Sequence, residues 1–381
     1  MQPGKERWLP KLAAVLALTT ACHAAVGAND EAMSLLSFSA FGTLSMVHSS
    51  EELADFTNSG LKETGAGYTD AWSPNVDTTL GAQVVLSVTP QLSATLQVVS
   101  EQNYDKTYTP HVEWANIKYQ FTPELSVRVG RTLLASFLFS DSRKVGYANP
   151  WVRPPVEAYS LVPVSTSDGL DVTWKVEVGR FSHTLIALAG QIDSRLPARL
   201  DGGAVEARDV LLLTDIVEFG PATLHFTYQE SDTTLPSVNV LFDAMRNFGP
   251  QGIALADKYD LRHKTVRFIG VGAMYDPGKW FAIGEWGNTE FHSAVGNRTA
   301  WYLSGGYRVA KFTPYVTFGE AISSTKRFDP GLDQSQLPPQ LAGFAAALNA
   351  GLNELLLTAP RQKSISVGAR WDVLTHASLK L

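Results

Sequence analysis

The feature that most constrains the fold is a series of short stretches in which apolar and polar residues alternate. In residues 38–46, one set is Phe38, Ala40, Leu44 and Met46 and the other is Ser39, Thr43 and Ser45. A period of two is typical of a β-strand with one apolar and one polar face. We expect about fifteen strands, at 36–47, 78–89, 91–100, 110–122, 124–132, 168–179, 180–190, 209–219, 222–231, 264–275, 279–288, 298–310, 311–322, 362–373 and 376–381.

The connections between these stretches alternate strictly in length. Seven are short, at 89–91, 122–124, 179–180, 220–222, 276–279, 310–312 and 374–376. Seven are longer, at about 48–77, 101–109, 133–167, 191–208, 232–263, 289–297 and 323–361. An antiparallel sheet with this alternation has all its short turns on one side, which is typical of a membrane β-barrel with short periplasmic turns and long extracellular loops. A soluble antiparallel barrel with one elaborate rim would also fit.

The amino end has the order of a secretory signal peptide. Lys5, Arg7 and Lys11 precede the apolar run 12–18, and small residues follow. The run is too short for a membrane-spanning helix, so we predict a leader at 1–24 with cleavage after Ala24, or alternatively after Gly27. Cleavage would remove the only cysteine of the chain, Cys22, so neither disulfides nor thiolate chemistry are expected in the mature protein.

Charge and composition exclude several classes of protein. Residues 1–24 hold three of the 31 Lys and Arg and one of the 37 Asp and Glu, which leaves 28 against 36 and a net charge near -8. This acidity argues against nucleic acid as a partner. No mature stretch approaches the 18 apolar residues of a membrane helix, and 45% hydrophobic with 18% charged residues is too apolar for a disordered chain.

The number of strands raises the question of closure. Single-chain bacterial barrels have even numbers of strands, whereas this sequence has fifteen and ends at Leu381 after about half of the last one. An open barrel would leave two unpaired edges in lipid, at several kcal/mol for each unsatisfied group. We therefore expect a sixteen-stranded barrel whose closing strand is missing from this sequence.

Aromatic residues gather beside the short turns. They are Tyr119, Phe121, Phe219, Tyr275, Trp280, Phe281 and Phe312. An amphipathic ring prefers the headgroup level of a bilayer, so the cluster is interpreted as an aromatic girdle. Ordinary strand propensity would also place aromatic residues in these stretches.

Three segments give the sequence a family resemblance. FSAFGTLSMVHSSEELADF (38–56), VRVGR (127–131) and KVGYANPWVRPPVEAYSLVPVSTSDGLDV (144–172) are similar to one proteobacterial branch of the trimeric Gram-negative porin family, the general diffusion porins. The resemblance covers essentially the whole mature chain. It implies an outer-membrane homotrimer, a third loop folded into each barrel, and small hydrophilic solutes as cargo. Family members end on a strand with a terminal aromatic residue, and this chain does not.

The resemblance identifies 133–167 as the inward-folded constriction loop. Prolines 150, 154, 155 and 163 restrict its backbone, as a pore of fixed cross-section requires. The candidate constriction residues are Asp141, Arg143, Lys144, Tyr147, Trp151, Arg153 and Glu157. We leave open whether Arg153 and Glu157 face the water path or pair with each other beside it.

Strand parity gives a second set of candidates on the wall. Charged residues that alternate with apolar ones should face the lumen, where fixed charge biases which ions pass. The predicted pore-lining residues are Lys118, Arg128, Asp171, Lys175, Glu177, Arg267, Arg308, Arg370 and Asp372. Any lumen-facing position tolerates charge, so their role in selection is a hypothesis.

Other signals in the sequence are weaker. Loops 232–263 and 323–361 contain stretches with helical spacing, interpreted as short helices on extracellular loops. The eight histidines lack metal-ligand spacing, so no cofactor or metal is expected. A substrate-selective channel for sugars or aromatic compounds, with aromatic residues lining a track, remains an alternative. An outer-membrane hydrolase, with a His and a Ser together on the outer face, is the rival of another class.

Overall fold

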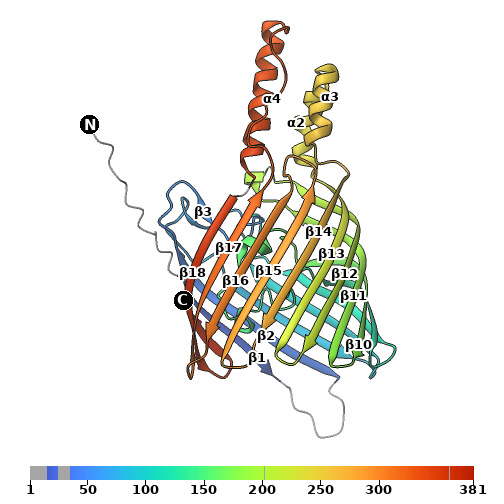
Figure 1. Ribbon diagram of the computed structural model, residues 1–381, viewed down its shortest axis with the longest axis vertical. Coiled ribbons are helices and arrows are strands. Elements are labelled where there is room, and N and C mark those ends of the chain that lie inside the picture. The colour runs from blue at the N-terminus through green and yellow to red at the C-terminus, as the bar shows by residue number, and fades with distance from the viewer. Residues whose placement is uncertain (1–14, 25–34, 201, 360) are drawn as a thin grey trace, which may run out of the picture.

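The protein is an antiparallel β-barrel with helices standing at one end (Figure 1). The computed structural model describes residues 15–24, 35–200, 202–359 and 361–381. The fifteen expected strands are β2 (Leu36–His48), β6 (Thr79–Ser87), β7 (Leu92–Glu101), β8 (His111–Gln120), β9 (Leu125–Leu133), β10 (Thr166–Val178), β11 (Phe181–Arg195), β12 (Ala204–Phe219), β13 (Ala222–Thr234), β14 (Lys264–Tyr275), β15 (Trp280–Phe291), β16 (Arg298–Tyr307), β17 (Phe312–Ser323), β18 (Arg361–Leu374) and β19 (Ala377–Lys380). Each lies within a few residues of its predicted position.

The main sheet has two strands beyond those fifteen. One is β5 (Trp72–Ser73), which pairs with the end of β2. The other is β1 (Val15–Ala24), which pairs with β2 over ten residues and with β19 through residues 17–20. A separate pair, β3 (Asp55–Phe56) and β4 (Ala66–Gly67), belongs to the loop after β2.

In the structure, β1 lies beside both β19 and β2, at the position expected for the closing strand. Pairing runs from β2 to β6 and then from neighbour to neighbour as far as β19, and β1 joins β19 to β2. In the unprocessed chain, residues predicted as leader therefore occupy the sixteenth position, where they satisfy two edges that would otherwise be unpaired. The basic residues of the predicted leader, at 5, 7 and 11, and the alternative cleavage site at Gly27 lie outside the described residues.

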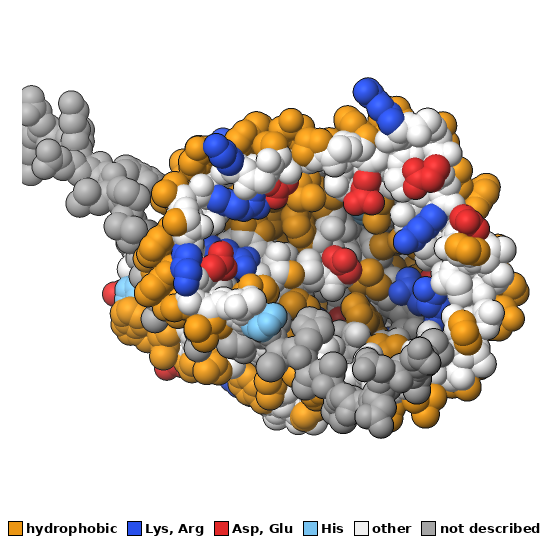
Figure 2. All heavy atoms as spheres, turned by 90° about the horizontal axis from the view of Figure 1, so that it is seen from below, with side chains coloured by type: hydrophobic (Ala, Val, Ile, Leu, Met, Phe, Trp, Pro, Cys, Tyr) orange, Lys and Arg blue, Asp and Glu red, His pale blue; other side chains and the backbone are white. Residues whose placement is uncertain are grey.

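The predicted alternation of turns and loops is found in the structure. All seven short connections lie at one end of the barrel, and the helices stand at the other (Figure 1). Seen from the short-turn end, hydrophobic side chains cover the outside of the wall, and charged ones surround a hollow (Figure 2). Most of the predicted girdle is exposed on the outer side, including Tyr119, Phe121 and Phe312, whereas Phe281 points inward and is buried.

Residues 134–165 connect β9 to β10 and fold into the barrel. Their only regular structure is a 3-10 turn, Gly146–Ala148, and one turn of helix, α1 (Val156–Tyr159). Apolar side chains of this segment form a core with inward-facing residues of the wall, mainly from β11, β12 and β14 to β17. The largest hydrophobic cluster thus lies inside the barrel, because the loop covers one side of its interior.

The helices α2 (Pro236–Arg246), α3 (Gly249–Tyr259) and α4 (Pro339–Leu357) form a second core above the barrel (Figure 1). The side-chain amides of Asn349 and Asn353 on α4 each hydrogen-bond both backbone groups of one loop residue, Leu332 and Asp329 respectively. Among the described helices, none is both long and apolar enough to cross a membrane.

Candidate functional site

The inward loop 134–165 is attached to the wall through its aromatic residues. Trp151 is only 3% exposed, and its indole N–H donates to Ser304 Oγ at 2.8 Å and lies 3.1 Å from Thr317 Oγ1. Tyr159 is equally buried and stacks on Phe137 with ring centroids 4.4 Å apart. Both rings are therefore packing groups.

A buried carboxylate on β15 holds the same face of the loop. Glu285 Oε1 accepts hydrogen bonds from the hydroxyls of Tyr159, at 2.9 Å, and Tyr302, at 2.7 Å. Its Oε2 accepts the backbone N–H of Leu138 at 2.8 Å. Glu285 therefore connects two separate points of the loop to the wall, and three donors satisfy a carboxylate that would be costly to bury alone.

Basic residues near the carboxyl end hold the loop backbone. Lys380 on β19 is buried, and its ammonium group donates to the carbonyl oxygens of Gly146, Asn149 and Trp151 within 2.8 Å. Arg370 on β18 donates to the carbonyl oxygens of Tyr147, at 2.7 Å, and Asn149, at 3.0 Å. Because the loop has little secondary structure, these side chains supply donors to its carbonyl oxygens, and only that of Gly146 also accepts a backbone N–H, from Asn149.

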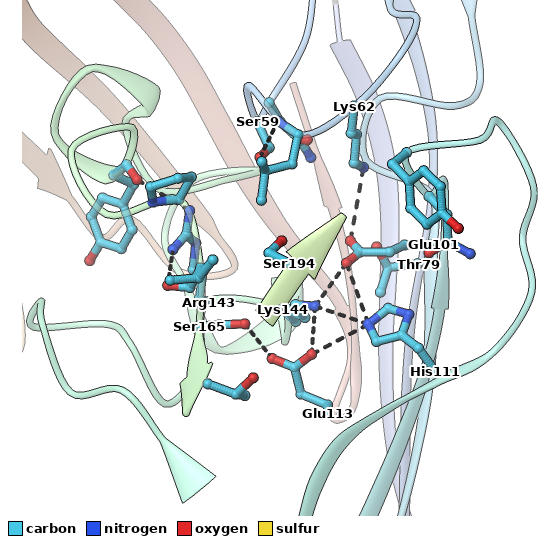
Figure 3. A pocket seen from close by; sticks show the side chains of 18 of the residues that line it. Ser59, Lys62, Thr79, Glu101, His111, Glu113, Arg143, Lys144, Ser165 and Ser194 are labelled. Atoms are coloured by element: carbon cyan, nitrogen blue, oxygen red, sulfur yellow. Dashed lines mark hydrogen bonds and ion pairs between the residues drawn. The ribbon is translucent and has the colours of Figure 1, made fainter. Parts of the chain in front are cut away.

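The opposite edge of the loop is charged and meets the wall formed by β7 and β8 (Figure 3). Lys144 Nζ lies 2.8 Å from Glu101 Oε1 and 2.7 Å from Glu113 Oε2. Lys62, from the loop after β2, approaches Glu101 at 3.9 Å, and His111 Nε2 lies 3.4 Å from Glu113. Cations from two loops and carboxylates from two strands thus form one network.

The open question about Arg153 and Glu157 is answered by their partners. Arg153 forms a two-point ion pair with Asp77, which precedes β6, and its guanidinium lies 4.9 Å from the ring centre of Phe56. Glu157 is buried and accepts a hydrogen bond from Gln362 at 2.7 Å. The two residues therefore bind different parts of the wall and do not pair with each other.

Of the three remaining candidates on the loop, two hydrogen-bond to backbone carbonyls and one is exposed. Arg143 donates to the carbonyl oxygens of Tyr159 and Val162, and its guanidinium lies over the Tyr159 ring. Tyr147 donates its hydroxyl hydrogen to the carbonyl of Thr375 at 2.6 Å. Asp141 is exposed on the loop surface.

A cavity of about 380 Å³ lies between the charged edge and the wall. Its lining includes Glu101, His111, Glu113, Arg143 and Lys144. Six Lys or Arg and five Asp or Glu line it in total, namely Lys62, Arg131, Arg143, Lys144, Arg153, Arg195, Asp77, Glu101, Glu113, Asp168 and Asp193. The fixed charge around this space is nearly balanced.

Predicted wall residues on β8 to β10 lie closer to the short turns. A second cavity, of about 250 Å³, is lined by Lys118, Arg128 and Lys175, and Arg128 Nε donates to Asp171 at 2.9 Å. Glu177, two residues after Lys175 on β10, is exposed. The predicted inward parity of these residues agrees with the outward exposure of the alternate positions, such as Trp174.

Three more predicted wall residues take part in ion pairs at the short-turn end, and one lies elsewhere. Arg308 binds Asp276 at 2.6 Å, and Arg370 binds Asp372 at 2.7 Å. The structure corrects the prediction that Arg267 lines the pore. Arg267 has the parity of the outward residue Ile269 and binds Glu230 at 2.7 Å. The alternate position, Phe268, packs inside the barrel against the loop, so in β14 both faces are apolar and hydropathy does not mark the lumen.

Sequence reasoning did not identify several residues of this site, among them Lys62, Asp77, Glu101, Glu113, Glu285 and Lys380. Glu101 shares the parity of the inward residue Gln97, so the period of two could have found it. Glu113 lies at a shift in the β7–β8 register, between Val112 and Trp114, which breaks the parity. Lys62 and Asp77 come from loop residues distant in sequence. Within the described part of the chain, no group of three or more His, Cys, Asp or Glu is arranged to hold a metal ion.

Comparison with known proteins gives structural similarity only. No family profile matches the sequence, and no curated protein matches it. OmpF of Salmonella typhi is 10% identical, with 97% of this chain and 96% of that chain covered and a TM-score of 0.49. The outer-membrane channel DcaP of Acinetobacter baumannii is 11% identical, with 97% and 87% covered and the same score. An anion-selective porin from Comamonas acidovorans is 11% identical, with 84% and 91% covered and a TM-score of 0.37. At these values we infer nothing about function from the similarity.

Proposed function

We propose that the protein is a passive diffusion channel for small hydrophilic solutes and ions in the bacterial outer membrane. The observation that supports this best is the cavity between loop 134–165 and the wall at β7 and β8, whose lining includes the contacting charges Lys144, Glu101 and Glu113. A loop fixed to the wall at many points holds the shape of this space constant. A path through such a space selects solutes by size and charge without covalent chemistry.

The apolar outer surface of the barrel wall supports the proposed location in the outer membrane. Outward positions hold exposed apolar residues such as Leu44, Ile365 and Val367, which suit lipid. Export by the leader 1–24, lipid as the surrounding partner and assembly as a homotrimer belong to the same proposal, and the last follows from the family resemblance alone. In this arrangement the short turns face the periplasm and the helices face the exterior.

The charges along the path support weak ion selectivity. Six cationic and five acidic side chains line the larger cavity, and the cations Lys144 and Arg153 are paired with carboxylates. Paired charges give a transverse field but little net potential. We therefore expect anions and cations both to pass.

Two alternatives receive less support. A sugar or aromatic track would need exposed rings, whereas Trp151 and Tyr159 are buried against the wall. A hydrolase would need a nucleophile beside an outward His. The outward His183 pairs with Asp215, and the outward positions next to it are Phe181, Leu185, Val176 and Val217, none of which is a nucleophile.

Conductance of the purified protein in a planar lipid bilayer tests the proposal. We expect stepwise, ohmic conductance in potassium chloride and a small reversal potential across a salt gradient. Absence of any conductance from protein shown to be folded and inserted would contradict the channel. A strong preference for cations would contradict only the account of selectivity.

A further inference from the structure

The outer face of β11 and β12 holds an ion pair in an otherwise apolar zone. His183 Nδ1 lies 3.0 Å from Asp215 Oδ2 and 3.2 Å from Oδ1. Both residues have outward parity, because Leu188 on β11 and Leu212 on β12 point into the interior core at alternate positions. Among strands with described side chains, no other Asp, Glu, Lys, Arg or His points outward within five strand residues of a short turn.

The depth of this pair makes it costly to expose to lipid. Asp215 is four residues from the end of β12 at Phe219. At about 3.3 Å per residue and a strand tilt of about 40°, it lies roughly 10 Å above the short turns. If the apolar wall spans the outer membrane as proposed above, this level lies inside the hydrocarbon layer, where charged side chains on the outer face destabilise a barrel.

The pair retains unused hydrogen-bonding capacity on its outer side. His183 Nε2 has no hydrogen bond to any described residue, and the two side chains are 28% and 31% exposed. The pair therefore offers one free imidazole nitrogen and one carboxylate with free lone pairs. Such a set is self-complementary, because the nitrogen of one copy suits the carboxylate of another.

We propose that the outer face of β11 and β12 is a contact between two copies of this chain, related by a two-fold axis parallel to the barrel axis. Copies inserted in the same orientation place equal residues at equal depth. At the depth of Asp215, the same pair of a second copy supplies both an imidazole and a carboxylate. Each His183 then bridges its own Asp215 and that of the partner copy.

The surroundings of the pair suit such a contact. Trp174, Leu213 and Phe226 flank it on β10, β12 and β13 and are 51%, 48% and 43% exposed. They can pack against the second copy through van der Waals contacts, and the hydrogen bonds of the four-residue cluster are strong in these surroundings of low dielectric. A two-fold contact does not generate a trimer, so it would connect assemblies formed through other faces.

Crosslinking between identical positions tests the contact. In a Cys22→Ser background, Leu213→Cys places one thiol beside the proposed axis, and Leu303→Cys on β16 is the matched outward control, 54% exposed. Full-length protein in lipid vesicles at low density is treated with a short thiol-to-thiol crosslinker. We expect the dimer yield at position 213 to exceed that at 303 several-fold and to fall to the control level when His183→Leu and Asp215→Leu are added.

The outcomes separate this contact from the proposed channel. Single-channel conductance is measured on the same samples and should be unchanged by the two leucine substitutions, because both positions lie outside the path. Equal crosslinking at 213 and 303, or crosslinking that survives the leucine substitutions, would overturn the contact. Loss of conductance in the parent protein would contradict the channel alone.

Discussion

The ammonium nitrogen of Lys144 lies 2.7 Å from a carboxylate oxygen of Glu113, and this ion pair joins the inward loop to the wall beside the cavity. A second carboxylate, that of Glu101, lies 2.8 Å away. Burial would lower the pKa of Lys144, but the two carboxylates outweigh burial and raise it. Lys144 is therefore charged throughout the neutral range, and the charge at this level of the path depends on it.

Reversal of this charge should make the channel prefer cations. In Lys144→Glu, three carboxylates replace a nearly neutral cluster. Two unit charges roughly 4 Å apart in water interact by about 1 kcal/mol. An energy of this size changes the ratio of cation to anion permeability about fivefold. The reversal potential in a potassium chloride gradient measures this ratio. Lys326→Glu, on an exposed loop, is the control, and an equal shift in both variants would contradict the position of the path.

Removal of the Lys380 ammonium group should loosen the constriction. Lys380→Met keeps the length of the side chain but removes three hydrogen bonds to the loop. The carbonyl oxygen of Trp151 then loses its donor, whereas that of Asn149 keeps Arg370 and that of Gly146 keeps the Asn149 N–H. Each hydrogen bond to a charged group contributes about 1.5–3 kcal/mol. We expect larger open-channel noise and a higher mean conductance in single-channel recordings. Lys311→Met, in a short turn, should leave both quantities at the wild-type level.

Truncation of Trp151 separates a packing role from a ligand-binding role. Trp151→Ala removes a buried ring and its hydrogen bond to Ser304, at a cost of about 3–5 kcal/mol. We expect a lower temperature of unfolding in detergent and a higher conductance, with uptake of sugars into vesicles reduced no more than that of other solutes of equal size. A selective loss of sugar uptake would favour the substrate-selective channel.

The packing of the loop after β17 against α3 should depend on pH. Burial would raise the pKa of Asp329, but hydrogen bonds from Lys258 and Tyr259 outweigh burial and lower it to about 2. Because this is below the ordinary value near 3.8, the stabilisation is present above about pH 4 and is lost as the pH falls through about 2. Hydrogen exchange of loop 324–338 measures it. Asp329→Asn should reduce protection at neutral pH, and Glu354→Gln should not.

Residues 15–24 are part of the predicted leader and also form strand β1. The amino terminus of the exported protein shows which of these two roles they have. A leader predicts a mature chain that begins at Ala25, and β2 and β19 then need a partner other than β1. The mass of the protein extracted from outer membranes measures this directly. Retention of residues 15–24 would show instead that β1 is a permanent strand of the wall.

Hydropathy alternation located all fifteen strands because most wall positions face either lipid or water. Alternation did not identify the inward face where loop 134–165 covers the inside of the wall. Phe268, Phe281 and Tyr302 face inward but are covered by loop residues, so in β14 to β16 the inward face is as apolar as the outward one. The assignment of Arg267 to the lumen was wrong for this reason.

The partners of the site residues were less predictable than the residues themselves. Lys144 and Arg153 were identified on the loop from the family resemblance. Their partners Glu113 and Asp77 lie 31 and 76 residues away, and this proximity depends on how the loop crosses the barrel. No local pattern in the sequence encodes that path. Lys380, although it holds three loop carbonyls, is in a strand too short for parity to be informative.

The most direct test of the water path places a thiol within it. Ser165 lines the larger cavity and donates its hydroxyl hydrogen to Glu113 at 2.6 Å, whereas Glu52 is exposed on the loop after β2. In a Cys22→Ser background, a charged thiol reagent is added to single open channels of Ser165→Cys and Glu52→Cys. The account predicts a stepwise fall in conductance for Ser165→Cys and none for Glu52→Cys. Conductance of Ser165→Cys that stays unchanged after complete labelling, verified by mass, would contradict it.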